Sequence, residues 1–272
     1  MKISIRHFFV FLIFCTPIQS IGSVDSFQSE FAKVVKSYWR PAVKVNGIST
    51  TVFDFKKMAS DYKSRTHPMR IAEDALVKID MSKMVTGVKE KTFLINLYNF
   101  AAMRLIVKNY PVDSIRSFKI SLIKYPWSKK DIVVGKRRFS LKQIEKEILL
   151  EKYPDPRVAF AVSCAAVSCP DRTSDIFRPE TLEKQMDEMV RTFLKNDKKG
   201  FAISKEKKTI TLSWIFDKDG HLFKALPEGG ALGFVLRYLD PTISKWIREN
   251  RRDLTIDYFE HYWALNDLAL MN

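Results

Sequence analysis

The sequence predicts an α+β fold in one domain, rich in helix and with short antiparallel strands that form hairpins. Several long segments repeat apolar side chains at a helical period, whereas the extended segments are short and stand in pairs around turns. The 272 residues contain no Gly-, Ser- or Pro-rich linker, no internal repeat and no low-complexity tract. Because a chain of this length can bury one large core, we expect a single domain.

Residues 1–22 have the pattern of a secretory signal peptide. A basic start and an apolar stretch at 8–15 are followed by small residues at Ser20 and Gly22. The apolar stretch is too short to span a bilayer comfortably, and no later stretch of about 18 apolar residues follows it. We therefore expect export to the periplasm or the medium, with no integral membrane segment after cleavage. An uncleaved N-terminal anchor is the alternative.

The next part of the chain predicts helices. The lead-in at residues 23–49 has a helical period of apolar side chains over 27–39. Three further helical patterns cover residues 52–62, 68–79 and 91–109.

The pattern at 91–109 is apolar almost all round, which is typical of a helix buried by the rest of the fold. Asn96 and Asn99 interrupt it and share one face at a spacing of three. Buried amides need hydrogen-bond partners. These two side chains therefore either tie down a neighbouring loop or form the wall of a site.

The remainder of the chain alternates short strands and helices. Gly135 separates two extended pieces within residues 127–141 and predicts a hairpin, and Ser140 predicts the N-cap of a helix at 141–153. The later predicted elements are a helix at 181–196, two strands within 201–214 around a turn at 206–208, short helices at 229–239 and 242–248, and a strand at 255–256.

The apolar run at residues 158–162 leads to Cys164 and Cys169, and Pro170 closes the segment. An apolar run of about five residues beside a polar turn predicts a buried strand whose end meets a loop. Such junctions often carry chemistry. Since Cys15 lies in the predicted signal peptide, the mature chain would keep only these two cysteines. The candidate site is therefore predicted at this turn.

Seven separate motifs, in their order along the chain, resemble the bacterial and plant family labelled domain of unknown function 547 (DUF547). The resemblance covers about residues 50–267 and predicts a DUF547-like domain at 50–270. It implies that the cysteine segment is the hallmark of the domain and that a papain-like fold surrounds the cysteines. Because plant members are discussed as interaction proteins, it also implies a role in binding partners. The motifs are INLYN at 95–99, YP to SI at 110–115, PW at 126–127, FSLKQIEKEIL at 139–149, DPRVAFAVSCAAVSCP at 155–170, ITLSWIF at 210–216 and YWALND at 262–267.

One position departs from the family pattern. Many members have a histidine where this chain has Ala159, so a Cys/His pair inherited through that position would lack its base. The mature histidines are His67, His221 and His261. We prefer His261 as a partner for Cys164 because it lies beside the closing YWALND motif, with His221 second.

Four interpretations of Cys164 and Cys169 remain open. They can form a structural or redox-active disulfide, as export would favour. One can be a nucleophile, which requires a neighbouring base or cation. Both can be inert buried residues. A metal site is the weakest interpretation, because zinc needs two more ligands and the spacing is unusual.

The sequence predicts no metal and no cofactor, since it contains no phosphate loop, dinucleotide motif or zinc-protease motif. Trp127, Trp214 and Trp263 are predicted to form the core or the wall of a pocket. Glu145 and its neighbours on the predicted helix at 141–153 are predicted to form a solvated face.

The net charge of +15 favours anionic partners, such as a component of the cell envelope, and a protein partner is the alternative. The lysines are spread over separate segments, and those at 198 and 199 are predicted to be solvated like the others. No nucleic-acid motif accompanies them, so we expect no nucleic-acid partner.

Two functional hypotheses follow. In the first, the protein is a thiol-dependent hydrolase or transferase, or a redox-active protein. Cys164 is the reactive group, Cys169 its resolving partner or brace, and His261 the base. In the second, the protein is a non-catalytic binding or scaffold module outside the cytoplasm, and a Cys164–Cys169 disulfide is only a brace. The sequence leaves open whether the protein is an enzyme.

Overall fold

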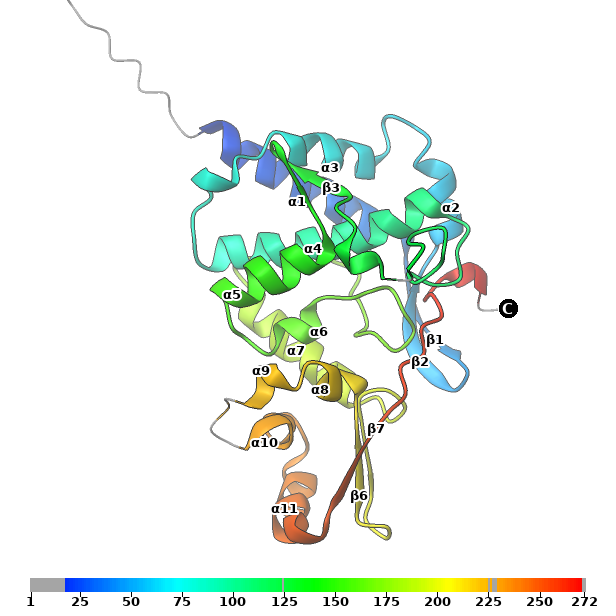
Figure 1. Ribbon diagram of the computed structural model, residues 1–272, viewed down its shortest axis with the longest axis vertical. Helices are drawn as coiled ribbons and strands as arrows, with labels where there is room; N and C mark the ends of the chain where they lie inside the picture. The colour runs from blue at the N-terminus through cyan, green and yellow to red at the C-terminus, as the bar shows by residue number, and fades with distance from the viewer. Residues whose placement is uncertain (1–17, 124, 225, 227–228, 271–272) are drawn as a thin grey trace, which may run out of the picture.

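The computed structural model describes residues 18–123, 125–224, 226 and 229–270, and it has the predicted α+β fold (Figure 1). Helices of the N-terminal half form one end of the molecule, and a small sheet with short helices forms the other. The predicted signal peptide lies mostly outside the described residues. Within them, no helix is both long enough and apolar enough to cross a membrane.

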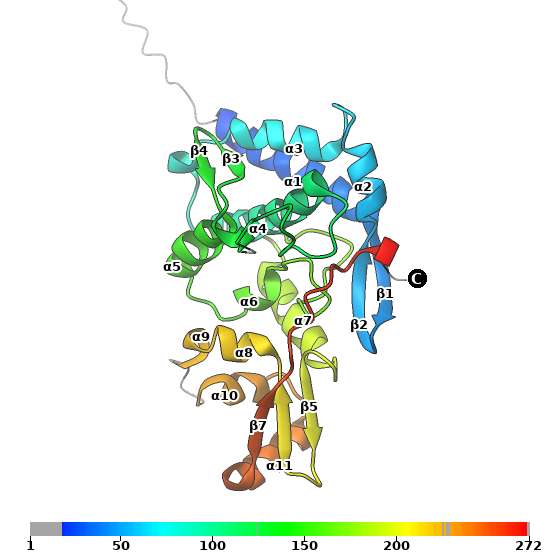
Figure 2. The same cartoon turned by 45° about the vertical axis from the view of Figure 1, so that its right-hand side comes forward.

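The long helix α4 (Val88–Asn109) is the centre of the N-terminal half, as the apolar pattern predicts. It is buried along almost its whole length, and α1 (Ile18–Tyr38), α2 (Phe55–Asp61) and α3 (Pro68–Val77) lie near it (Figure 2). Phe27 of α1 meets Phe100 of α4 edge to face, with ring centroids 5.3 Å apart. Such aromatic pairs add to the free energy gained by burying apolar area.

The predicted helix at 52–62 is wrong in its first part. Residues 39–53 form an antiparallel hairpin of β1 (Trp39–Val45) and β2 (Ile48–Phe53), so the lead-in is helical only as far as Tyr38. The hairpin is rich in Val, Ile and Thr, which favour strands. Asp54 then caps α2 by accepting a hydrogen bond from the backbone N–H of Lys57.

The predicted hairpin at Gly135 is confirmed. It pairs β3 (Ile132–Val134) with β4 (Arg137–Phe139), and Gly135 has a φ of +58°. The predicted cap at Ser140 is also present: its Oγ accepts from the backbone N–H of Gln143, whose side chain accepts from the Ser140 N–H. The helix that follows is π-helical over Gln143–Leu149 before α5 (Leu150–Lys152).

The predicted strand at 158–162 is wrong. Residues Val158–Ala161 form a single helical turn, α6, which begins where Asp155 accepts hydrogen bonds from the backbone N–H groups of Arg157 and Val158. No strand pairs with the apolar run among the described residues. Instead, Phe160 enters a cluster of phenylalanine rings, and Asn99 of α4 binds the backbone as the turn ends.

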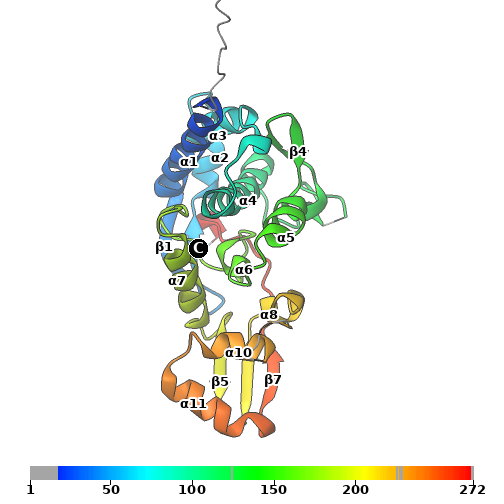
Figure 3. The ribbon, with the colours of Figure 1, turned by 90° about the vertical axis from the view of Figure 1, so that its left-hand side faces the viewer.

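The C-terminal half contains a three-stranded sheet in the order β5-β6-β7 (Figure 3). β5 (Phe201–Ser204) and β6 (Thr209–Leu212) form the predicted hairpin, whereas β7 (Thr255–Tyr258) is parallel to β6. A parallel neighbour requires a crossover connection. That connection holds α8 (Trp214–Lys218), α9 (His221–Lys224), α10 (Gly230–Leu236) and α11 (Pro241–Asn250), and α7 (Leu182–Leu194) precedes the sheet.

After β7 the chain returns to the N-terminal half as an extended segment. Leu265 forms a β-bridge with Ala166 beside the cysteines, and Asp267 forms one with Phe53 of β2. The C-terminal segment at residues 259–267 thus joins both ends of the molecule and passes the cysteine turn (Figure 2).

We expect Ser213→Ala to destabilise the protein by about 1 kcal/mol. The Ser213 hydroxyl oxygen caps α8 by accepting from the backbone N–H of Ile215, and an alanine leaves that N–H without its partner. Urea denaturation would measure the loss. Ser213→Asn, which keeps a capping oxygen, should lose much less stability. Equal losses of stability in both variants would contradict the capping role.

Candidate functional site

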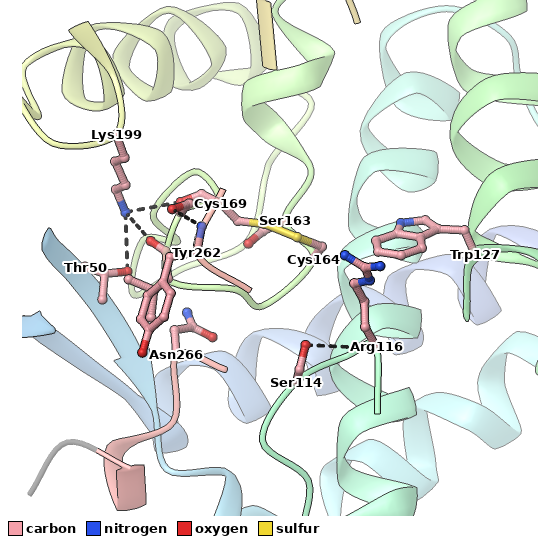
Figure 4. Close-up of a disulfide and its surroundings, with 12 residues drawn as sticks. Thr50, Ser114, Arg116, Trp127, Ser163, Cys164, Cys169, Lys199, Tyr262 and Asn266 are labelled. Atoms are coloured by element: carbon pink, nitrogen blue, oxygen red, sulfur yellow. Dashed lines mark hydrogen bonds between the residues drawn. A yellow bond between two sulfur atoms is a disulfide. The ribbon is translucent and has the colours of Figure 1, made fainter. Parts of the chain in front are cut away.

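Cys164 and Cys169 form a disulfide with their Cα atoms 6.2 Å apart (Figure 4). Of the four interpretations, the structure therefore supports the disulfide. Both residues are nearly buried, with 8% and 5% of their surface exposed. In this oxidised form neither sulfur is a thiolate, which is the form that binds metals or attacks carbon.

The disulfide lines a cavity of about 40 Å³. A ring nitrogen of His261 lies within 4.8 Å of both sulfur atoms, so the C-terminal segment brings this histidine to the cysteines across nearly a hundred residues of chain. The predicted second choice, His221, is an exposed residue of α9 that does not line the cavity. The catalytic roles given to Cys164 and His261 remain predictions.

Three tryptophans form much of the cavity wall, at the positions that the sequence predicts. Trp127 and Trp263 meet edge to face at 5.7 Å between ring centroids, and Trp214 and Trp263 do so at 5.6 Å. The Trp127 indole N–H donates to the hydroxyl oxygen of Tyr98, 3.2 Å away. The three rings thus pack against one another and form an apolar part of the cavity wall.

His261 packs against two of these rings, at centroid distances of 4.7 Å from Trp214 and 4.1 Å from Trp263. Its Nε2 is buried and has no hydrogen-bond partner among the described residues. Burial, together with the positive charges of Lys218, Arg116 and Lys199, lowers the pKa of His261 to about 4. At pH 7 the imidazole is neutral and can accept a proton.

This shifted pKa predicts a pH dependence of stability. Because the folded pKa of about 4 lies below the ordinary value of 6.5, the unfolded chain binds the proton more readily. The free energy of unfolding therefore decreases as the pH falls from about 6.5 to about 4. At about 1.4 kcal/mol per pKa unit, the loss due to His261 is about 3 kcal/mol. Urea denaturation from pH 7 to 4 should show a smaller loss in His261→Gln than in the wild type, and equal losses would contradict it.

Glu145 and Asp219 also line the cavity, and the half-buried Lys146 lies between their carboxylates. Lys146 binds Glu145 and Asp219, each at 2.9 Å. Burial opposes the positive charge, but the two carboxylates raise the pKa of Lys146 above its usual value. The prediction that Glu145 belongs to a solvated face is wrong: it is 6% exposed, because the π-helical segment turns it toward Tyr98. Burial and the charge of Glu145 raise the pKa of Tyr98.

Lys199 is a second correction, since the sequence interpretation places it among the solvated lysines. It is 1% exposed, and its Nζ donates to the carbonyl oxygens of Val167 and Cys169, to Thr50 Oγ1 and to Asp171 Oδ1 (Figure 4). The turn between the cysteines is therefore attached to β2 through one buried ammonium group.

Asn96 and Asn99 are buried and fully bonded to backbone. Asn96 exchanges two hydrogen bonds with the N–H and C=O of Phe177, and Asn99 accepts from the Ser163 N–H while donating to the Ala161 carbonyl. Neither lines the disulfide cavity, although Asn99 lines a smaller one beside it. Of the two alternatives, the tethering of loops is thus the one that the contacts support.

The sequence analysis does not single out several residues that lie at or near the cavity. Lys218 is the last residue of α8 and Asp219 its C-cap, and Lys218 Nζ lies 5.0 Å from the Trp214 ring centroid. The Arg116 guanidinium carbon lies over the Trp263 ring, 4.8 Å from its centroid. Tyr98 stands between the two asparagines in the INLYN motif, and this position could have suggested it.

Comparisons with curated proteins and with solved structures returned no match to the chain. The papain-like part of the fold prediction therefore stays a prediction. A family model described as "Protein of unknown function, DUF547" matches residues 82–194, which include α4, the π-helical segment and both cysteines. The resemblance seen in the motifs is thus confirmed over this part of the sequence, and the match supports a DUF547 family protein.

Proposed function

We propose that the protein is redox-active and exchanges the Cys164–Cys169 disulfide with external thiols, with His261 as the proton carrier. The observation that carries the proposal is the His261 nitrogen that, within the described ranges of the chain, has no hydrogen-bond partner in the cavity that the disulfide lines. A disulfide that serves only as a brace needs no base beside it. Burying a polar atom without a partner costs free energy, so such an atom at a site calls for an explanation.

The positive charges around the cavity favour thiol–disulfide exchange. Lys218, Arg116 and Lys199 act on His261 from three segments of the chain, and a thiolate formed in the same cavity would be stabilised by the same field. His261 itself is uncharged at pH 7, and its lowered pKa means that it gives up a proton readily, so it holds the thiol proton only until the leaving thiolate takes it back. The cavity has room for a small group such as a thiol, because one water needs only about 10–15 Å³ by this measure.

The first step is written as an exchange. An external thiol R–SH gives its proton to His261, and the resulting thiolate attacks Cys164 Sγ, the more exposed of the two residues. The R–S–Cys164 bond forms, the bond to Cys169 breaks, and the Cys169 thiolate takes the proton back from His261. A second R–SH then releases R–S–S–R and leaves both cysteines reduced, so two thiols supply the two electrons.

The test is a redox titration of the full chain. The protein is equilibrated in glutathione or dithiothreitol buffers of graded potential, its thiols are alkylated, and the two cysteines are read by mass spectrometry. Redox activity predicts a reduction potential above about −300 mV, the upper end for structural disulfides. A potential below this value would contradict the proposal, and the disulfide would then be the brace of a binding module.

A pair of histidine variants separates proton transfer from burial. Reduction of His261→Gln by dithiothreitol at pH 7 should be at least about 10-fold slower than in the wild type, since general acid–base catalysis contributes about 10²–10⁴-fold in enzymes. His221→Gln, which changes an exposed histidine outside the cavity, should reduce at the wild-type rate. Equal rates in all three proteins would remove His261 from the mechanism.

Export remains part of the proposal. The N-terminal pattern supports it, and so does the disulfide, because disulfides persist in oxidising compartments and are rare in the cytosol. We propose an envelope or extracellular location, where the excess positive charge would favour an anionic partner. Fractionation of the cells that express the chain, followed by N-terminal sequencing of the product, tests location and cleavage together.

A further inference from the structure

A second cavity next to the disulfide turn collects unpaired polar atoms. Of the six buried side-chain atoms that have no hydrogen-bond partner within the described part of the chain, four belong to residues that line it. They are both terminal nitrogens of Arg172, Ser163 Oγ and Asn266 Oδ1. These three residues are 5%, 7% and 3% exposed, so bulk water does not reach them freely. Phe53, Phe55 and Met103 form an apolar part of the lining.

The charge of Arg172 is uncompensated. Over the residues that the structure describes, no carboxylate forms an ion pair with it, and the adjacent Asp171 is bound to Lys199 instead. Phe177 gives a weak contact, with the guanidinium carbon 5.8 Å from its ring centroid. Burial alone lowers the pKa of Arg172 to about 9, which still leaves the group charged at pH 7. A buried charge without a partner is costly, and folded proteins normally supply one.

We propose that this cavity binds one small anion of the halide class, for which chloride is the abundant example. The guanidinium N–H groups of Arg172 and the hydroxyl of Ser163 would donate to it. The cavity volume of about 10 Å³ leaves room for one water-sized particle and is too small for phosphate or sulfate. A water molecule could pair with the same donors, but it would leave the positive charge unbalanced.

The position of the site gives the anion a structural consequence. Ser163 directly precedes Cys164, and Asn266 belongs to the C-terminal segment (Figure 4). The backbone N–H of Asn266 donates to the Ala165 carbonyl. Asn266 also donates from its side chain to the carbonyl of Thr51 in β2. An anion held here would therefore join the cysteine turn, β2 and the C-terminal segment at one point.

Thermal unfolding of the full chain in sodium chloride and in sodium gluconate, at equal ionic strength, tests the proposal. A ligand that binds only the folded protein raises its melting temperature, by about 5–10 °C for each hundredfold rise in concentration above the Kd for a protein of this size. We expect this rise with chloride and not with the bulky gluconate. Identical melting temperatures in the two salts at every concentration would overturn the proposal.

Two variants and one crystal make the result specific. Arg172→Met removes the charge but keeps an apolar stem, and should abolish the chloride response, whereas Arg178→Met changes a nearby exposed arginine and should retain it. If Arg172→Met fails to fold, Ser163→Ala serves in its place and should weaken the apparent chloride affinity several-fold. In a wild-type crystal soaked in bromide, an anomalous peak between Arg172 and Ser163 supports the site. Peaks only elsewhere overturn it.

Discussion

Replacing Lys199 with methionine is expected to destabilise the protein by about 3–5 kcal/mol, the cost measured when one member of a buried ion pair is removed. The substitution leaves the apolar stem but removes the ammonium group. Asp171 then loses its counter-charge, and the carbonyl oxygens of Val167 and Cys169 lose a donor in a site closed to water. Asp171 still accepts a hydrogen bond from the backbone N–H of Thr51, so its carboxylate keeps part of its stabilisation.

Urea denaturation at pH 7 measures this loss. The matched control is Lys198→Met, because Lys198 is the exposed neighbour on the same segment and its removal should change the free energy of unfolding by less than about 0.5 kcal/mol. Similar small effects in both variants would show that the buried ammonium group contributes little beyond its stem.

Phe160→Ala is expected to cost about 3–5 kcal/mol, as phenylalanine truncations in well-packed cores do. The Phe160 ring is fully buried and lies 5.5–6.4 Å, centroid to centroid, from four other phenylalanine rings. Its partners come from α7, α8, α9 and α10, so the cavity left by the alanine would touch four helices at once. The partner rings are Phe193, Phe216, Phe223 and Phe234.

The conservative variant Phe160→Leu keeps most of the volume and should cost less than about half as much. Differential scanning calorimetry of both variants gives the comparison. If alanine and leucine cost the same, the loss would come from a specific aromatic contact and not from the cavity.

The sequence predicts those elements whose signal is local. Gly135 between two extended pieces fixes a hairpin, and the apolar residues of α4 recur so densely that only a buried helix accommodates them. The apolar run at 158–162 carries no such information, since five apolar residues fit a strand or a helical turn equally well. Here the outcome depends on Asn99 and on the phenylalanine cluster, which come from distant parts of the chain.

The residues of the candidate site also differ in whether the sequence identifies them. The cysteines and tryptophans can be named from the sequence because these residue types are rare and stand in motifs. The burial of Lys199 and Glu145 could not be named, because a lysine or glutamate in the sequence looks the same whether it is solvated or enclosed. Arg172 follows the cysteine turn without any pattern to mark it, and only the packing around it shows that its charge has no partner among the residues that the structure describes.

The C-terminal segment also sets an order of events during synthesis. The two cysteines are five residues apart, so their disulfide can close soon after both have been made. His261 and the strand that pairs with β6 are produced nearly one hundred residues later. Until then β2, the cysteine turn and the sheet lack the segment that connects them. The candidate site therefore cannot assemble before residue 261 has been made, and a chain cut short ahead of that residue would carry a disulfide without its histidine.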